Sequence, residues 1–295
     1  MADKMQRNPH PDFKKVESSR PDFDTTSSPS YTKTPSPSWK MGQGANSLDP
    51  PSSASASHTS IDPYDRGRPA AFNYKLLISS IVPRPIAFVS TCAADGSSAN
   101  LAPFSYFNML NHDPPLFVVG LSAAAAGSAK DTLRNLTDAG ECVVNIISEA
   151  YVEAANAAAV NAPYGVDEWA VSGLHPASDC ETVRPARVRE AVFSIEAKVD
   201  TIKHYDSRAN PGRRSGTVVI LEGLRFWVRD DAVNEEKSLV DINVLRPVGR
   251  LGGITYTRAN NLFELPRFDW ENDLGGEEGY KKIQEAYGKG ADSTK

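Results

Sequence analysis

The sequence predicts a mainly β protein in which antiparallel strands form a closed or nearly closed barrel, with only a few short helices. Two patterns favour this fold class. A turn at Asp95-Gly96 joins two strand-like segments, residues 86–91 and 100–107, and glycine there tolerates the positive φ that a tight hairpin turn needs. Residues 192–199 alternate between apolar and polar side chains, which is typical of a strand with one buried face and one wet face.

The remaining strand-like segments extend this pattern along the chain. Residues 116–121 form a continuous apolar run, which is typical of a strand covered on both faces, and residues 142–148 are expected to form another buried strand. Residues 217–228 have the composition of a long strand, with a bulge expected at Gly223. Strands therefore outnumber helices, as in an antiparallel barrel rather than a parallel sheet with crossover helices.

Three helices are expected. Ser128 followed three residues later by Asp131 resembles a capping box at the start of the first helix, and Gly140 is expected to end it. The second helix is Ala-rich and covers residues 149–160. The third is a short helix over residues 277–287, within a polar C-terminal segment.

Composition divides the chain into three parts. Residues 1–63 hold nine prolines and many serines, with Val16 and Leu48 as the only aliphatic Val, Leu or Ile up to position 60. Such a segment cannot bury enough apolar surface to offset its ordering entropy, so we expect a disordered tail that the folded domain does not need. Residues 64–270 suit one folded domain, and residues 271–295 are expected to form a polar, flexible tail.

Charge and composition exclude several classes of function. The net charge of −5, without a basic stripe, gives no sign of nucleic-acid binding. No apolar run approaches about 18 residues, so no membrane span is expected, and the absence of a signal makes a cytoplasmic location the default. The five histidines form no HxH or HxxxH pair, so no metal site is expected. The three cysteines are far apart, which suits a reducing compartment.

A lysine and two hydroxyls stand at the expected N-terminus of the first helix, in residues 127–132. Free backbone N–H groups and the positive end of the helix dipole favour an anion there, and Lys130 adds a full charge. A phosphate monoester is therefore a candidate ligand. The alternative, which the segment alone favours, is a capped surface helix that begins with a solvated lysine.

Four polar residues interrupt the strand that follows the hairpin: Asn100, Ser105, Tyr106 and Asn108. Such groups need hydrogen-bond partners, and a polar ligand along the strand end is the simplest one. An edge strand whose Asn and Ser face water is an equal alternative. Arg84 lies between two prolines that restrict it to extended conformations. This arrangement suits either a preorganised cation or an exposed arginine where a strand begins.

Several motifs occur in the order that a known family keeps. PRPIAFVST, a DG turn and NLAPFSYFN come first, followed by Pro114-Pro115, KDTLRN, GECVVNI and RLGG before Tyr256. Over residues 66–266 the chain resembles the flavin reductase-like FMN-binding split-barrel family. The resemblance implies an antiparallel split β-barrel of Greek-key type, usually a homodimer that binds FMN near the subunit interface.

The resemblance also implies the chemistry. Hydride would pass from NAD(P)H to N5 of FMN without a catalytic protein residue, and the reduced flavin would serve a partner such as a monooxygenase. The residues expected to bind the flavin are Arg84, Ser90, Thr91, Asn100, Ala102, Ser105, Tyr106, Ser128, Lys130, Asp131 and Thr132. Strand propensity alone could account for Ser90 and Thr91.

Two other functions stay open: a non-enzymatic flavin-binding or electron-carrier protein, and a ligand-free structural barrel that acts in dimeric assembly. The chain departs from the family's pattern at residues 207–215, which are basic. Arg208, Arg213 and Arg214 could bind a 2′-phosphate and so select NADPH, although such a run is more often a solvated loop.

Overall fold

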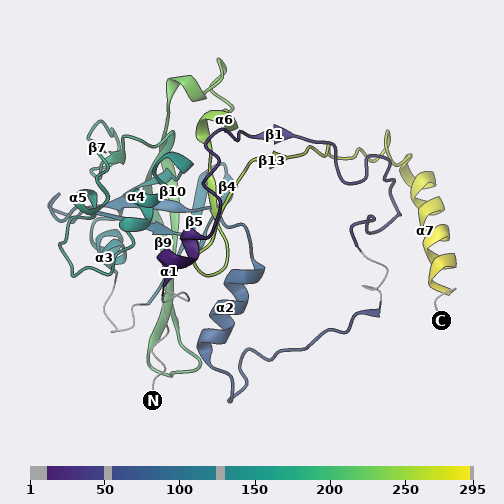
Figure 1. The fold of residues 1–295 in the computed structure, drawn as a ribbon, viewed down its shortest axis with the longest axis horizontal. Coiled ribbons are helices and arrows are strands. Elements are labelled where there is room, and N and C mark those ends of the chain that lie inside the picture. Colours follow the sequence, from purple (N-terminus) through teal and green to yellow (C-terminus); the bar gives the residue numbers. More distant parts are fainter. Residues whose placement is uncertain (1–11, 50–54, 124–129, 293–295) are drawn as a thin grey trace. The chain divides into compact units, whose positions relative to one another are not determined.

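The computed structural model describes three stretches of the chain: residues 12–49, 55–123 and 130–292. They form two compact units (Figure 1). The first unit contains Asp62–Ala259 together with the segment that ends at Ser27, and it carries the large sheet. The second unit combines Ser28–Ile61 with the C-terminal segment that begins at Asn260.

Seven antiparallel strands form the sheet of the first unit. They are β2 (Ala87–Thr91), β3 (Asn100–Phe104), β4 (Phe107–His112), β5 (Pro115–Ser122), β6 (Glu141–Ile146), β9 (Phe193–Asp206) and β10 (Arg214–Val228). Their order across the sheet is β3-β2-β6-β9-β10-β5-β4. This sheet confirms the prediction of a mainly β, antiparallel protein. A register shift beside Gly223 in the β9–β10 pair confirms the expected bulge.

Short helices and small strands complete the first unit. The α-helices are α1 (Phe13–Ser18), α2 (Ala70–Ser80), α3 (Asp131–Asp138), α4 (Val152–Ala157), α5 (Glu168–Ser172) and α6 (Ile242–Leu245). The remaining elements are the 3-10 helices η2 (Glu149–Tyr151) and η3 (Asp230–Ala232), and the strands β7 (Pro176–Ala177), β8 (Arg187–Val188), β11 (Val248–Arg250) and β12 (Tyr256–Arg258). No helix in the described stretches is long and apolar enough to cross a membrane.

The edge strands β3 and β4 are consecutive in the chain, with only Ser105 and Tyr106 between them. Neighbouring strands lie about 4.8 Å apart, so the edges of a flat seven-stranded sheet would be about 29 Å apart, whereas this link covers about 10 Å. The sheet therefore curls until its edges meet, and the Gly120 amide donates to the Tyr106 carbonyl at 2.7 Å. The expected single strand over residues 100–107 is wrong, because the chain leaves one edge after Phe104.

Apolar side chains fill the inside of the curled sheet. Ala87 and Val89 of β2 belong to an inner cluster, while Phe88 between them belongs to a second cluster on the opposite face. Leu133 and Leu136 of α3 pack into the inner cluster, as their common helix face predicts. The barrel core therefore fixes the position of α3.

Two helix starts differ from expectation. The expected capping-box residue Ser128 lies outside the described residues, and the helix that follows has Lys130 as its N-cap. The expected helix over residues 149–160 is instead a 3-10 turn followed by α4. Ser148 caps this turn, because its hydroxyl accepts a hydrogen bond from the Ala150 amide at 3.2 Å.

The polar face of β9 is buried at Ser194 and Glu196, contrary to the expected wet face, whereas Lys198 of the same face is exposed. Ser194 and Glu196 are at most 1% exposed. The Glu196 carboxylate accepts hydrogen bonds from the amides of Glu181 and Thr182, and the Trp227 indole donates a third at 2.6 Å. Burial would raise the pKa of Glu196, but these hydrogen bonds outweigh it and hold the pKa below its ordinary value. Alternation along one strand cannot reveal a loop that covers its polar face.

The second unit contains few regular elements. β1 (Ser30–Tyr31) pairs in parallel with β13 (Asn261–Leu262), and α7 (Gly276–Asp292) ends the described chain. α7 includes the expected short helix over residues 277–287. The expected limits of the N-terminal tail, the folded domain and the C-terminal tail stay predictions.

Candidate functional site

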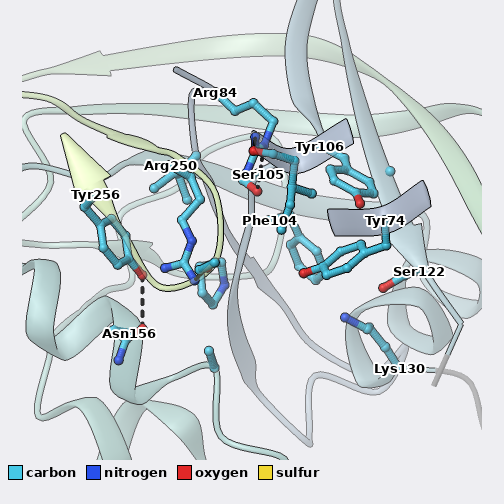
Figure 2. Close-up of a pocket in the computed structure, with 16 residues that line it drawn as sticks. Tyr74, Arg84, Phe104, Ser105, Tyr106, Ser122, Lys130, Asn156, Arg250 and Tyr256 are labelled. Carbon is cyan, nitrogen blue, oxygen red and sulfur yellow. Dashed lines mark hydrogen bonds between the residues drawn. The ribbon is translucent and has the colours of Figure 1, made fainter. Parts of the chain in front are cut away.

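A pocket of about 240 Å³ lies at the seam where the barrel closes (Figure 2). Ser105 and Tyr106, the two residues that link β3 to β4, form part of its wall. The other elements around the seam supply further polar side chains: Tyr74 from α2, Ser122 from β5, Lys130 before α3, and Arg250 and Tyr256 from the β11–β12 pair. The pocket is therefore a product of barrel closure and of the segments that surround the seam.

One end of the pocket combines a cation with two tyrosines. Lys130 Nζ lies 5.3 Å from the centre of the Phe104 ring, and Figure 2 shows Tyr74 next to Lys130, with Tyr106 beyond Tyr74. Gly120 makes room for Tyr106, because a Cβ at position 120 would approach the Cβ of Tyr106 to 2.9 Å. Burial raises the pKa of Tyr106, and Tyr74 adds to this rise. The Tyr106 hydroxyl therefore stays protonated at neutral pH and can donate a hydrogen bond.

The opposite end is formed by the β11–β12 pair and α4. The Arg250 guanidinium lies 4.3 Å from the centre of the Tyr256 ring and donates to the Gly253 carbonyl at 2.8 Å. The Tyr256 hydroxyl donates to Asn156 Oδ1 at 3.0 Å. These contacts hold both side chains in defined orientations, which suits a site that recognises a ligand of fixed shape.

The charged side chains among the described residues that line the pocket are all cations. Figure 2 shows Lys130 and Arg250 on opposite sides of Phe104, and no aspartate or glutamate occurs among the described residues that line the pocket. Cations between aromatic walls suit a flat, anionic molecule. The volume is below the range of about 300 to 1,000 Å³ that is typical of small-molecule pockets, so one chain encloses only part of such a molecule.

Arg84 lines the pocket but directs its guanidinium into the protein, and it is 8% exposed. Its terminal nitrogens donate to the carbonyls of Ile78 and Ile81 at 2.7 and 2.6 Å, and to the Leu251 carbonyl at 2.9 Å. Its Nε donates to Ser105 Oγ at 3.4 Å. Four of the five N–H donors are thus used within the chain. Arg84 ties the end of α2 to the segment after β11 and to the β3–β4 link.

Four buried residues form a second polar group, which we call the buried network: Thr91, Asn100, Thr132 and Asn135. Asn100 Nδ2 donates to Thr132 Oγ1 at 2.9 Å and to Thr91 Oγ1 at 3.3 Å. Asn135 Nδ2 donates to the same Thr91 oxygen at 3.1 Å. None of the four is among the residues that line the pocket. The network joins β2 and β3 to α3 and so fixes the helix that Lys130 caps.

The other expected site residues lie in separate places. The Ser90 hydroxyl is buried and donates to the Ala186 carbonyl, and Ala102 is partly buried against the inner cluster. Asp131 opens α3 and is partly buried, which raises the pKa of its carboxyl. Ser128 lies outside the described residues.

The structure brings four of the expected residues to the pocket: Arg84, Ser105, Tyr106 and Lys130. The lining residues that sequence reasoning missed include Tyr74, Ser122 and Asn156. Asn73 and Lys75 make α2 polar around Tyr74, so the sequence gives no signal that points to Tyr74. The positions of Ser122 and Asn156 carry no such signal, because only the closed barrel brings them to the seam.

The sequence family described as the flavin reductase like domain matches residues 79–245. Among solved structures, nitrilotriacetate monooxygenase component B from Bacillus cereus is 33% identical, with a TM-score of 0.65, over 71% of this chain and 100% of that one. A 2-nitrobenzoate 2-nitroreductase from Pseudomonas fluorescens is 28% identical, with a TM-score of 0.62, over 72% of this chain and 98% of that one.

A third structure identifies the barrel type. A protein from Shewanella frigidimarina, assigned as a flavin reductase with a split barrel domain, has a TM-score of 0.58 and covers 72% of this chain and 100% of that one. Its sequence identity of 19% supports a statement about the fold alone. The curled sheet described above is accordingly a split barrel, which confirms the predicted architecture.

Proposed function

Because the chain belongs to the family of flavin reductase-like domains, we propose that it is an oxidoreductase that binds FMN and transfers hydride from NAD(P)H to it. The observation that carries this proposal is the pocket at the barrel seam. It has cations at both ends, tyrosines along its wall and no carboxylate among its described lining residues. A flat ring system with an anionic phosphate matches that combination of groups.

The residues of the pocket fit FMN in chemical type. Lys130, at the N-cap of α3, supplies a charge for the phosphate, and the helix N-terminus adds free N–H groups. Ser105 and Tyr106 offer hydroxyl and backbone groups where the edge of β3 ends, which suits the polar edge of the ring. When bound, the flavin accepts hydride at N5, and this is the chemistry that the protein itself lacks. The chain contributes orientation and charge.

The remaining expected residues have positioning roles in this proposal. The buried network fixes α3, and Arg84 fixes α2 and the segment after β11 around the pocket. Asp131 begins the helix beside Lys130. In this proposal these side chains hold the elements around the pocket in place and do not contact the flavin.

We propose that the protein acts as a homodimer. Large apolar side chains are exposed on α2 and β4, including Phe72 (51%), Leu77 (55%), Met109 (64%) and Leu110 (52%). A group of exposed apolar side chains of this kind is typical of an interaction site. The small volume of the pocket in one chain agrees with a site that a second copy completes. Light scattering on the eluting protein tests this, and a monomer at micromolar concentration would contradict it.

The similarity to nitrilotriacetate monooxygenase component B suggests where the electrons go. We propose that reduced flavin leaves the pocket and serves a separate monooxygenase. A cationic pocket formed in part by exposed residues is compatible with a flavin that exchanges with solvent.

Anaerobic titration tests the central proposal. Purified protein is expected to take up FMN, with quenching of its fluorescence, and NADPH or NADH is expected to bleach the bound flavin. Flavin that binds but that neither nucleotide reduces would make the protein a flavin carrier. Protein that takes up no FMN would contradict both functions and leave a structural barrel.

A further inference from the structure

The β9–β10 hairpin runs past the sheet to which it belongs. β6 pairs with β9 only as far as Lys198, and β5 pairs with β10 only from Gly216. We call residues 200–214 the ribbon; its two strands pair with each other beyond those limits (Figure 1). An isolated two-stranded ribbon adds little stability in water, so its length is not explained by packing.

The ribbon carries charge of the opposite sign to the whole protein. Its exposed cations are Lys203, Arg208, Arg213 and Arg214, and its carboxylates are Asp200 and Asp206. The surplus of two positive charges stands in a chain of net charge −5. A local reversal of this kind attracts an anion to one place on the surface.

Exposed aromatic rings accompany these cations. The Arg208 guanidinium lies 4.8 Å from the centre of the Tyr64 ring, and Tyr64 is 62% exposed. Lys203 Nζ lies 5.2 Å from the centre of the Tyr205 ring, which is also exposed. An aromatic face for a base beside a cation for a phosphate is the arrangement that proteins use to hold nucleotides.

The root of the ribbon lies beside the pocket. Ser122, which lines the pocket, pairs with Gly216 across the β5–β10 ladder, and the Ala123 amide donates to the Ser215 carbonyl at 3.0 Å. Neighbouring strands are only about 4.8 Å apart. Tyr64, which contacts Arg208 of the ribbon, precedes α2, and Tyr74 of α2 also lines the pocket. Ribbon and pocket are therefore within reach of one extended molecule.

We propose that the ribbon binds the 2′-phosphate of the adenosine half of NADPH, so that the protein uses NADPH in preference to NADH. This inference rests on the proposed function. Arginine forms paired, charge-assisted hydrogen bonds with a phosphate, and arginines near the ribose accommodate a 2′-phosphate in other nucleotide sites. NADH carries a hydroxyl at that position and offers Arg208 and Arg214 no anion.

Binding of nucleotide fragments tests the ribbon without turnover. Calorimetry with 2′,5′-ADP and with 5′-AMP is expected to show about tenfold tighter binding of 2′,5′-ADP, the nucleotide with the 2′-phosphate. The double variant Arg208→Ala/Arg214→Ala is expected to abolish that difference. The double variant Arg225→Ala/Arg229→Ala removes the same charge near the far end of β10 and is expected to keep it. Equal affinity of the wild type for the two nucleotides would overturn the proposal.

Reduction of the flavin gives a second readout. The ratio of kcat/KM for NADPH to that for NADH is expected to exceed about ten and to fall about tenfold in the ribbon variant. A protein that reduces flavin equally well with both nucleotides, or better with NADH, overturns the ribbon assignment while the proposed function stands. Bound flavin that neither nucleotide reduces overturns the proposed function, and the 2′,5′-ADP titration then still decides the ribbon.

Discussion

Two groups of polar side chains, both expected from the sequence to bind a ligand, meet at the start of α3, where Lys130 is the N-cap and Thr132 lies in the first turn. Thr132 faces the buried network, where its hydroxyl accepts a hydrogen bond from Asn100. Lys130 faces the pocket, where its Nζ lies over the Phe104 ring. Lys130 has an extended backbone and Thr132 a helical one, so one short motif serves both places.

The comparison separates two reasons for polar residues in apolar segments. In the buried network, each side chain finds its partner in another side chain of the network, so the group is complete without a ligand. At the pocket, Ser105, Tyr106 and Lys130 line a cavity that a ligand can enter. The buried network should therefore determine the free energy of unfolding, and the side chains that line the pocket should determine the affinity for FMN. Four variants test that division.

Arg84→Ala should have the largest effect, because Arg84 lines the pocket and also makes buried hydrogen bonds that hold the elements around it. Its removal leaves the carbonyls of Ile78, Ile81 and Leu251 without their donor, and we expect the free energy of unfolding to fall by about 4 kcal/mol. FMN affinity should fall with it. Urea unfolding and FMN titration measure the two effects. Arg84→Lys should be intermediate, whereas Arg229→Ala, at an exposed ion pair, should cost less than about 1 kcal/mol.

Asn100→Ala should affect stability alone. The variant leaves Thr132 without its buried donor, removes one of the two donors to Thr91 and creates a small cavity, so the free energy of unfolding should fall by about 3 kcal/mol. FMN affinity of the folded fraction should change less than about twofold. Asn108→Ala, at an exposed position, is the matched control and should unfold like the wild type. A large loss of FMN affinity in Asn100→Ala, with an unchanged free energy of unfolding, would contradict this division between stability and affinity.

Lys130→Ala should show the reverse behaviour. Loss of one charge-assisted contact with the phosphate should weaken FMN binding by about 1.5 to 3 kcal/mol. The free energy of unfolding should change little, because Lys130 precedes α3 rather than packing in its core. Lys198→Ala removes the same charge from an exposed position on β9 and should bind FMN normally. Unchanged flavin retention in Lys130→Ala would remove Lys130 from the phosphate site.

Deletion of residues 1–60 should have the smallest effect. The contacts of this segment with the barrel include the Ser27 carbonyl, which accepts hydrogen bonds from Arg246 and Arg258 at 3.1 and 3.2 Å. Both arginines keep their ion pairs with Glu149 after the deletion. The free energy of unfolding should therefore fall by less than about 1 kcal/mol, with FMN uptake unchanged. A larger loss of either would show that the segment is part of the folded domain.

The barrel was predictable because most of its strands have a recognisable pattern in their own residues. Glycine at position 96 has a φ of +84°, as the expected turn requires, and the continuous apolar run became β5. The break between β3 and β4 was not predictable, because crossing from one sheet edge to the other is a property of the closed sheet. The buried face of β9 was missed for a similar reason, since the donors to Glu196 come from a loop that is distant in sequence.

The candidate site was predictable only in part, because the sequence does not show in which direction each side chain points in the folded chain. Sequence identifies Thr91, Asn100 and Thr132 as candidate binding residues, but it does not show that they face one another. It identifies Arg84 as a cation on a stiff backbone, but the carbonyls that receive its N–H groups belong to α2 and to the segment after β11. Residues from such separate elements meet only in the folded chain.

The Ser105–Tyr106 link has a consequence for how this protein can change. Because these two residues both shut the barrel and border the pocket, an insertion there would disturb the architecture and the ligand together. New specificity is easier to reach through α2, the β11–β12 pair and the ribbon, which are attached around the barrel and can vary without reopening it. Selection for a different nucleotide or flavin would therefore change residues in α2, the β11–β12 pair and the ribbon, and would leave the Ser105–Tyr106 link unchanged.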